Sequence, residues 1–150
     1  MSPLEPMAQQ LDWFTDNLIY NLDFIPDDKL DWKPAPPANS ALEIVNHLGG
    51  GLSAMRSVIC GGEYTPDFQP ATGRESAVAL LKHQSSLLAR VIRELPPHEM
   101  EQTVHLPWGE FSKPIALSMD VTDVIHHHGQ IAYIQTLLGD TESHFKDLGT

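Results

Sequence analysis

Residues 119–138 read MDVTDVIHHHGQIAYIQTLL, and their apolar positions recur every three or four residues. This spacing aligns side chains along one face of an α-helix and is typical of a helix that packs against other helices. The seam consists of Asp120, Val124, His127, Ile131, Ile134 and Leu138. It places a histidine in the middle of a face that otherwise packs inward.

A second seam on the same segment turns a different histidine inward. It consists of Val121, Val124, Ile125, His128 and Ala132. In that register His128 points into the protein and Asp123 points toward solvent. The spacing alone therefore leaves open whether His127 or His128 faces the core. Successive helical residues point about 100° apart, so we expect His126 to be solvated.

Three other segments show the same helical spacing and end at residues typical of helix boundaries. The four predicted helices cover residues 4–23, 41–60, 74–95 and from 115–117 to 138. Ser40 and Glu43 have the spacing of a capping box at the start of the second helix. Residues 103–111 are predicted to form a short β-hairpin. The pattern predicts an all-α fold, a four-helix bundle with long connections.

Length and composition limit the class of protein. The 150 residues, 41% of them hydrophobic and 19% charged, predict one folded domain spanning residues 1–150. The net charge of −11 disfavours binding to nucleic acid or to an anionic membrane surface. A single cysteine and the absence of a signal-peptide pattern or a long apolar run predict a cytoplasmic protein that does not cross a membrane.

The second predicted helix carries a histidine followed by three glycines. His47 lies on a seam beside the more apolar face of this helix, at the flank of the core. Gly49, Gly50 and Gly51 each cost about 1 kcal/mol relative to alanine inside a helix. We therefore expect close helix packing or a bound ligand to compensate for them.

Asp123 and His127 are separated by one helical turn, so both side chains can point to one place, as paired metal ligands on a helix do. A single histidine on an apolar face is more often a hydrogen-bonded core residue than a metal ligand. A second candidate, His47 on another helix, makes the metal interpretation about as strong as the structural one.

Two segments resemble the DinB-like family of metal-binding four-helix bundles. LDWKPAPP at residues 30–37, Asn39-Ser40 and residues 43–48 are similar to the family's entry into its second helix. HHGQI at residues 127–131, with residues 133–135 and 138–140, is similar to its last helix. The resemblance implies a four-helix bundle along nearly the whole chain.

In that family, one histidine of the second helix and an i, i+4 histidine pair of the last helix bind a divalent metal ion. The resemblance carries these roles to His47 and His127, and it places Asp123 where the family usually has histidine. A carboxylate is an accepted ligand. The implied ion is zinc or nickel first, then manganese or iron; no other cofactor is implied and no catalytic residue is assigned.

The resemblance also implies transferases and isomerases that depend on low-molecular-weight thiols. The first hypothesis is therefore a divalent-metal-dependent enzyme, a thiol S-transferase or a hydrolase, that acts on a small molecule. The second is a non-catalytic metal-binding or stress-associated bundle. The third is a metal-free interaction module or homodimer in which the glycines allow close helix contact.

Overall fold

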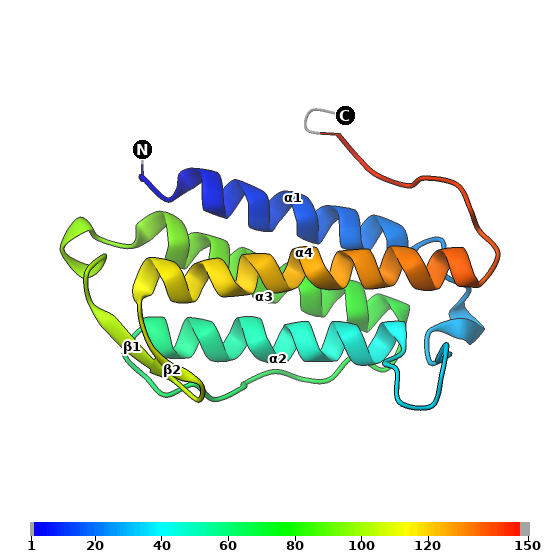
Figure 1. Cartoon of the computed structure of the whole chain (residues 1–150), viewed down its shortest axis with the longest axis horizontal. Helices are drawn as coiled ribbons and strands as arrows, with labels where there is room; N and C mark the ends of the chain where they lie inside the picture. The colour runs from blue at the N-terminus through cyan, green and yellow to red at the C-terminus, as the bar shows by residue number, and fades with distance from the viewer. Residues whose placement is uncertain (1, 148–150) are drawn as a thin grey trace.

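Four long helices account for most of residues 2–147, the part of the chain that the computed structural model describes. They are α1 (Glu5–Leu22), α2 (Ala41–Ile59), α3 (Arg74–Glu94) and α4 (Lys113–Leu137), and they lie side by side in Figure 1. Short 3₁₀ turns occupy Asp27–Lys29 and Pro97–Glu99. The predicted helix boundaries agree with these to within a few residues, so the mostly helical fold is confirmed.

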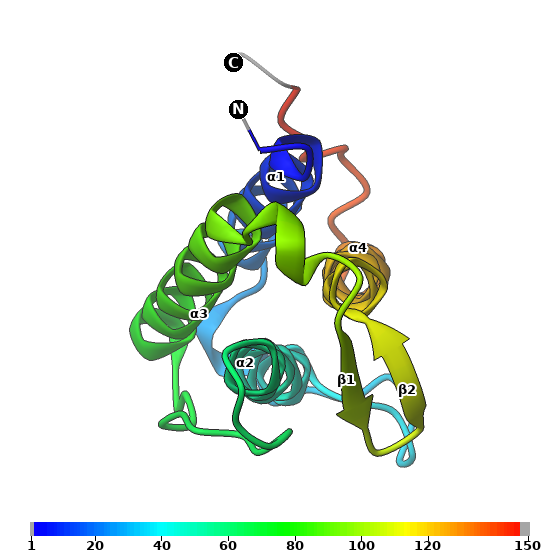
Figure 2. The same ribbon diagram turned by 90° about the vertical axis from the view of Figure 1, so that its left-hand side faces the viewer.

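The helices do not pack in the order of the sequence. The chief contacts of α1 are with α3 and α4, and α2 contacts the same two helices. Figure 2 shows α1 and α2 diagonally opposite each other, with α3 and α4 between them on either side. In Figure 1, α1 and α4 run in one direction and α2 and α3 in the other. Residues 60–73 run back along α2 to connect the parallel α2 and α3.

Apolar side chains from all four helices meet between them. Fully buried side chains include Leu11 and Leu18 of α1, Leu48 and Leu52 of α2, Leu81 and Leu88 of α3, Leu117 and Ile131 of α4, and Leu106 of the strand Thr103–Leu106. Among the described residues, no helix combines the length and the apolar character needed to cross a bilayer. The core holds α2 and α4 in contact, and this contact positions the site described below.

A two-stranded antiparallel sheet interrupts the helical fold. Strand β1 (Thr103–Leu106) pairs with β2 (Gly109–Ser112), with Leu106 opposite Gly109. The predicted hairpin is therefore confirmed, and the all-α prediction is corrected to a mostly helical fold with one small sheet. Val104 and Leu106 are buried, so the hairpin packs on the helices through one face. Gly109 has a φ of +146°, which favours glycine at this turn.

The start of α2 and the end of the described chain are both held by side chains. Ser40 Oγ accepts a hydrogen bond from Glu43 N, and Glu43 Oε2 accepts one from Ser40 N, so the capping box is present. Near the C-terminus, Lys146 N donates to Asn17 Oδ1 at 2.6 Å. Lys146 O accepts from Trp13 Nε1 at 2.7 Å. Residues 141–147 are thus attached to α1.

The three glycines of α2 have different surroundings. A Cβ atom at Gly49 would lie 2.7 Å from Leu80 Cδ2, and one at Gly50 would lie 3.2 Å from the ring of Phe68. A Cβ atom at Gly51 would meet nothing within 4 Å. Close packing against α3 and against the 60–73 segment therefore accounts for Gly49 and Gly50, and no packing contact accounts for Gly51.

This difference predicts opposite effects of two neighbouring substitutions. Gly51→Ala is expected to raise the free energy of unfolding by about 0.5–1 kcal/mol, because alanine favours the helix and the added methyl group has space. Gly49→Ala is expected to lower it by about 1–2 kcal/mol, because the methyl group overlaps Leu80. Urea denaturation of both variants measures the difference. Equal stabilisation by the two would contradict the close approach of α2 and α3 at Gly49.

Candidate metal centre

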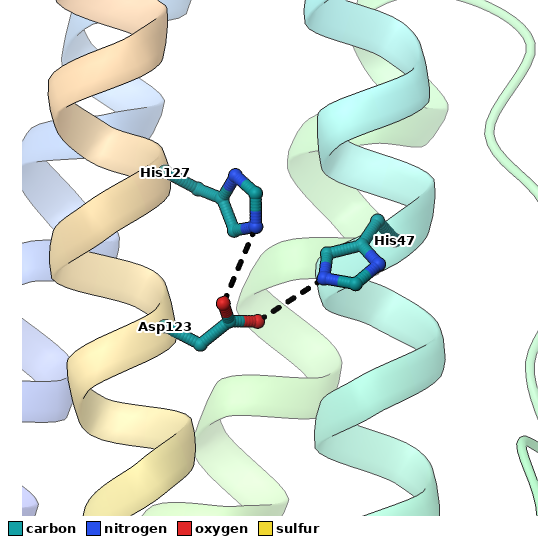
Figure 3. A group of neighbouring side chains, drawn as sticks. All are labelled: His47, Asp123 and His127. Carbon is teal, nitrogen blue, oxygen red and sulfur yellow. Dashed lines mark ion pairs between the residues drawn. The ribbon is translucent and has the colours of Figure 1, made fainter. Parts of the chain in front are cut away.

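Side chains from α2 and α4 meet between these helices. His47 projects from α2, and Asp123 and His127 project from α4 toward it (Figure 3). Asp123 Oδ2 lies 3.3 Å from His47 Nε2, and Asp123 Oδ1 lies 3.3 Å from His127 Nε2. The three ligand atoms lie within 4.8 Å of one another. The structure therefore brings together the three residues singled out from the sequence.

The local structure explains why these side chains converge. Asp123 and His127 are one turn apart on α4, so they point the same way. On α2, Ile44 and Leu48 are buried in the core, which leaves the intervening His47 at the edge of the helix facing α4. The ring centroids of His47 and His127 are 4.8 Å apart, and the planes of the two rings are inclined at 66°.

The cluster opens to solvent on one side. The side chain of His47 is 57% exposed, that of Asp123 is 37% exposed and that of His127 is 9% exposed. His47 was expected at the flank of the core, and it lies further out than that. The cluster is therefore open to solvent at His47 and Asp123 and covered at His127.

Gln130 orients the imidazole of His127. His127 Nδ1 lies 2.6 Å from Gln130 Oε1, which can only accept, so Nδ1 carries the proton of this hydrogen bond. Nε2 is thereby directed toward Asp123, as a metal-ligating nitrogen with an outer hydrogen-bond partner is. The motif at 127–131 contained Gln130, and its i, i+3 spacing from His127 was the available sequence signal for this role.

The charges of the cluster favour a proton shared between carboxylate and imidazole. Burial lowers the pKa of His127, but hydrogen bonds to Asp123 and Gln130 outweigh it and raise that pKa above its ordinary value. Burial raises the pKa of Asp123, but hydrogen bonds and charge from His127 and His47 outweigh it and lower that pKa. Because a ligating imidazole must lose this proton, a metal ion and the proton compete for the same place.

The donor set fits a divalent ion. Bonds of about 2.1 Å in a tetrahedral site place neighbouring ligand atoms about 3.4 Å apart. Asp123 Oδ2 is 3.3 Å from His47 and Asp123 Oδ1 is 3.3 Å from His127, close to this spacing. One ligand atom from each of the three residues lies within 4.8 Å of the others, so the three donors can gather around one ion. Two imidazoles and a carboxylate suit zinc and other divalent transition metals, and three protein ligands leave a position open for another molecule.

His128 is also buried, but it faces a different helix. Its Nε2 lies 2.8 Å from Asn21 Oδ1, and its ring packs near Phe14 and Phe145. Both histidines are therefore buried, because α4 lies between α1 and α2 and packs against each, while Ile125 of the second seam is exposed. His127 faces α2 and His128 faces α1. His126 is exposed, as expected.

A second carboxyl group lies one turn before Asp123. Asp120 is 7% exposed, and its Oδ2 is buried without a hydrogen-bond partner among the described residues. Burial, with a smaller effect from the charge of Asp123, raises the pKa of Asp120 to about 7. Burial and the charges of Asp120 and Asp123 also raise the pKa of Tyr64. A carboxyl group with a pKa near neutral pH thus lies close to the cluster, and its burial agrees with the first seam of residues 119–138, which includes Asp120.

Comparison with known proteins identifies a family and a similar fold. A family model described as the DinB superfamily matches residues 10–131. Among solved structures, a DinB-like protein from Bacillus subtilis, YjoA, has a TM-score of 0.72 and 20% sequence identity to this chain. The match covers 89% of this chain and 94% of the other, and at that identity it concerns the fold alone. A comparison with curated proteins found no match.

Proposed function

Since the chain belongs to the DinB superfamily, we propose that His47, Asp123 and His127 bind one divalent metal ion between α2 and α4. The observation that carries this proposal is the convergence of one ligand atom from each residue to within 4.8 Å, with His127 held by Gln130. The resemblance implies zinc or nickel first, then manganese or iron, and imidazole and carboxylate donors can bind each of these ions. The four helices would then form the four-helix bundle of DinB-like proteins.

The proposed activity is transfer or hydrolysis on a small molecule, with a low-molecular-weight thiol as the reaction partner in the transferase case. When bound, such an ion lowers the pKa of a coordinated water to about 7 or deprotonates a coordinated thiol. The carboxylate of Asp123 adds negative charge to the centre, which favours retention of a cation and weakens its acidifying effect relative to a third imidazole.

Other residues of the chain would support this chemistry. Gln130 keeps the Nε2 of His127 directed at the centre through the hydrogen bond to Nδ1. The exposed side chain of His47 leaves the approach from solvent open. Asp120, buried one turn from Asp123, can hold or release a proton near neutral pH at its carboxyl group.

Titration with metal tests the proposal. After treatment with chelator, the protein is expected to bind one equivalent of zinc or nickel by isothermal titration calorimetry and to retain it on desalting, as measured by elemental analysis. In a screen for thiol conjugation with electrophilic small molecules, turnover is expected with the ion and is expected to stop when chelator is added.

The outcomes separate the three hypotheses. Failure to take up any of the four metals would contradict the metal centre and favour the metal-free module, whose homodimeric state light scattering would measure. Uptake of one equivalent without turnover of any thiol or hydrolysable substrate would contradict the enzyme and favour a non-catalytic metal-binding protein.

A further inference from the structure

A pocket of about 340 Å³ lies between the proline-rich connector before α2 and the outer side of α4. Its apolar lining comes from Pro34, Pro37, Ala38, Ile44, Tyr133 and Ile134. Two amide side chains, those of Asn39 and Gln130, complete it. Ile44 and Ile134 belong to the core, so this floor of the pocket is fixed by the packing of α2 against α4.

The pocket adjoins the candidate metal centre through both helices. Gln130, which lines the pocket, is the residue whose Oε1 accepts the hydrogen bond from His127 Nδ1. On the other helix, Ile44 lies one turn before His47. A molecule in the pocket therefore lies about one helical turn from the proposed metal ligands, with Gln130 between them.

The lining indicates the chemistry of the occupant. It contains no carboxylate, ammonium, guanidinium or imidazole group, so it offers no partner for a charged ligand and favours an uncharged one. Prolines and Tyr133 present flat apolar surfaces suited to a ring, while the two amides can orient one polar substituent. A cavity of about 150 Å³ already holds benzene, so this pocket has room for a substituted ring.

We propose that this pocket binds the uncharged, ring-bearing part of the small molecule that reacts at the metal centre. The proposal rests on the proposed function for the position of the reacting end, but the pocket itself needs no metal. The connector favours such a role, because prolines limit its conformations in the free protein and so reduce the entropy lost on binding.

The first experiment uses metal-free protein, so that it does not depend on the metal centre. Benzyl alcohol is titrated into chelator-treated, ¹⁵N-labelled protein, and the side-chain amide signals of Asn39 and Gln130 are expected to shift. Ala38→Leu, which fills the pocket, is expected to weaken this binding about tenfold. Ala35→Leu is the matched control, because Ala35 belongs to the same turn, is exposed and does not line the pocket.

The second experiment connects the pocket to the metal centre. In cobalt(II)-loaded protein, the thiolate-to-cobalt absorption band reports binding of benzyl mercaptan and of ethanethiol. Ala38→Leu is expected to weaken binding of benzyl mercaptan about tenfold and to leave ethanethiol unchanged. Equal effects on the two thiols would overturn the placement of the ring in this pocket.

The two experiments distinguish failure of the pocket from failure of the metal site. In one outcome, cobalt fails to bind while benzyl alcohol still shifts the amide signals and Ala38→Leu weakens the binding of benzyl alcohol. In that case the proposed function fails, and the pocket proposal stands without its link to the metal. If cobalt binds and benzyl alcohol leaves those signals unchanged, the metal centre stands and the pocket proposal is overturned.

Discussion

His127→Ala is expected to reduce the affinity of the protein for zinc or nickel by about 1000-fold or more. His127 is the most buried of the three ligands, and Gln130 fixes its orientation, so no mobile side chain replaces its nitrogen at the centre. Loss of an outer hydrogen-bond partner alone costs about 10–100-fold in affinity, and loss of a ligand exceeds this. Isothermal titration calorimetry of the chelator-treated variant measures the change, and elemental analysis should find no stoichiometric metal.

Neighbouring residues supply the controls for this experiment. His126→Ala removes the adjacent, exposed imidazole, whose Nε2 lies 3.3 Å from Gln130 Nε2, and is expected to lower metal affinity less than Gln130→Ala does. Gln130→Ala is expected to have an intermediate metal affinity, about 10–100-fold below that of the wild type. His47→Ala should also fail to retain stoichiometric metal, while Asp123→Ala should weaken metal binding. Normal binding by His127→Ala together with loss of binding by His128→Ala would show that the ligand on α4 is wrongly assigned.

The helices were predictable because their signals are local. The capping box of Ser40 and Glu43 marks the start of α2 within four residues of sequence. The spacing of apolar side chains in residues 119–138 predicts the buried side of α4 even when the helices that pack against it are not known. The hairpin at residues 103–112 follows from the alternation of apolar and polar residues on either side of a two-residue turn. In each case the residues that decide the structure are neighbours in the chain.

The choice between His127 and His128 could not be made from the same signals. A seam analysis assumes one buried face, but α4 packs against both α1 and α2 and buries two faces. Which histidine meets His47 depends on the order of the helices around the core, and that order depends on residues 60–73 crossing back along α2. The hydrogen bonds of Asn17 with Lys146 join positions far apart in the chain and have no local pattern.

The site was found by combining two kinds of information. The i, i+4 spacing predicted that Asp123 and His127 point together, and the resemblance to DinB-like proteins supplied His47 as their partner on another helix. Neither the spacing nor the resemblance predicted how exposed His47 is, because its exposure depends on how α2 and α4 pack in the folded protein. The pocket beside Gln130 could not be predicted from the sequence either, because its walls come from a connector and two helices that meet only in the folded protein.

Asp120→Asn is expected to stabilise the metal-free protein, and to do so more at pH 8 than at pH 5. The pKa of Asp120 is raised from 3.8 to about 7 in the folded protein. Between these values the folded state holds a proton that the unfolded state has lost, so the stability contributed by Asp120 declines as the pH rises toward and through 7. A shift of this size corresponds to about 4 kcal/mol at most. Asparagine cannot ionise, so the variant avoids this loss.

Urea denaturation with chelator present, at pH 5, 6 and 8, measures the effect. At pH 5 the carboxyl group is protonated in the folded state but ionised in the unfolded state, so the variant should gain about 1–2 kcal/mol there, less than at pH 8. Asp123→Asn is the matched control on the same helix. Its pKa is lowered by its histidine partners, so the variant should be less stable than the wild type at pH 6. If Asp120→Asn instead destabilised the protein equally at all three pH values, the carboxylate of Asp120 would be charged and hydrogen-bonded in the folded state, contrary to its buried and unpartnered oxygen.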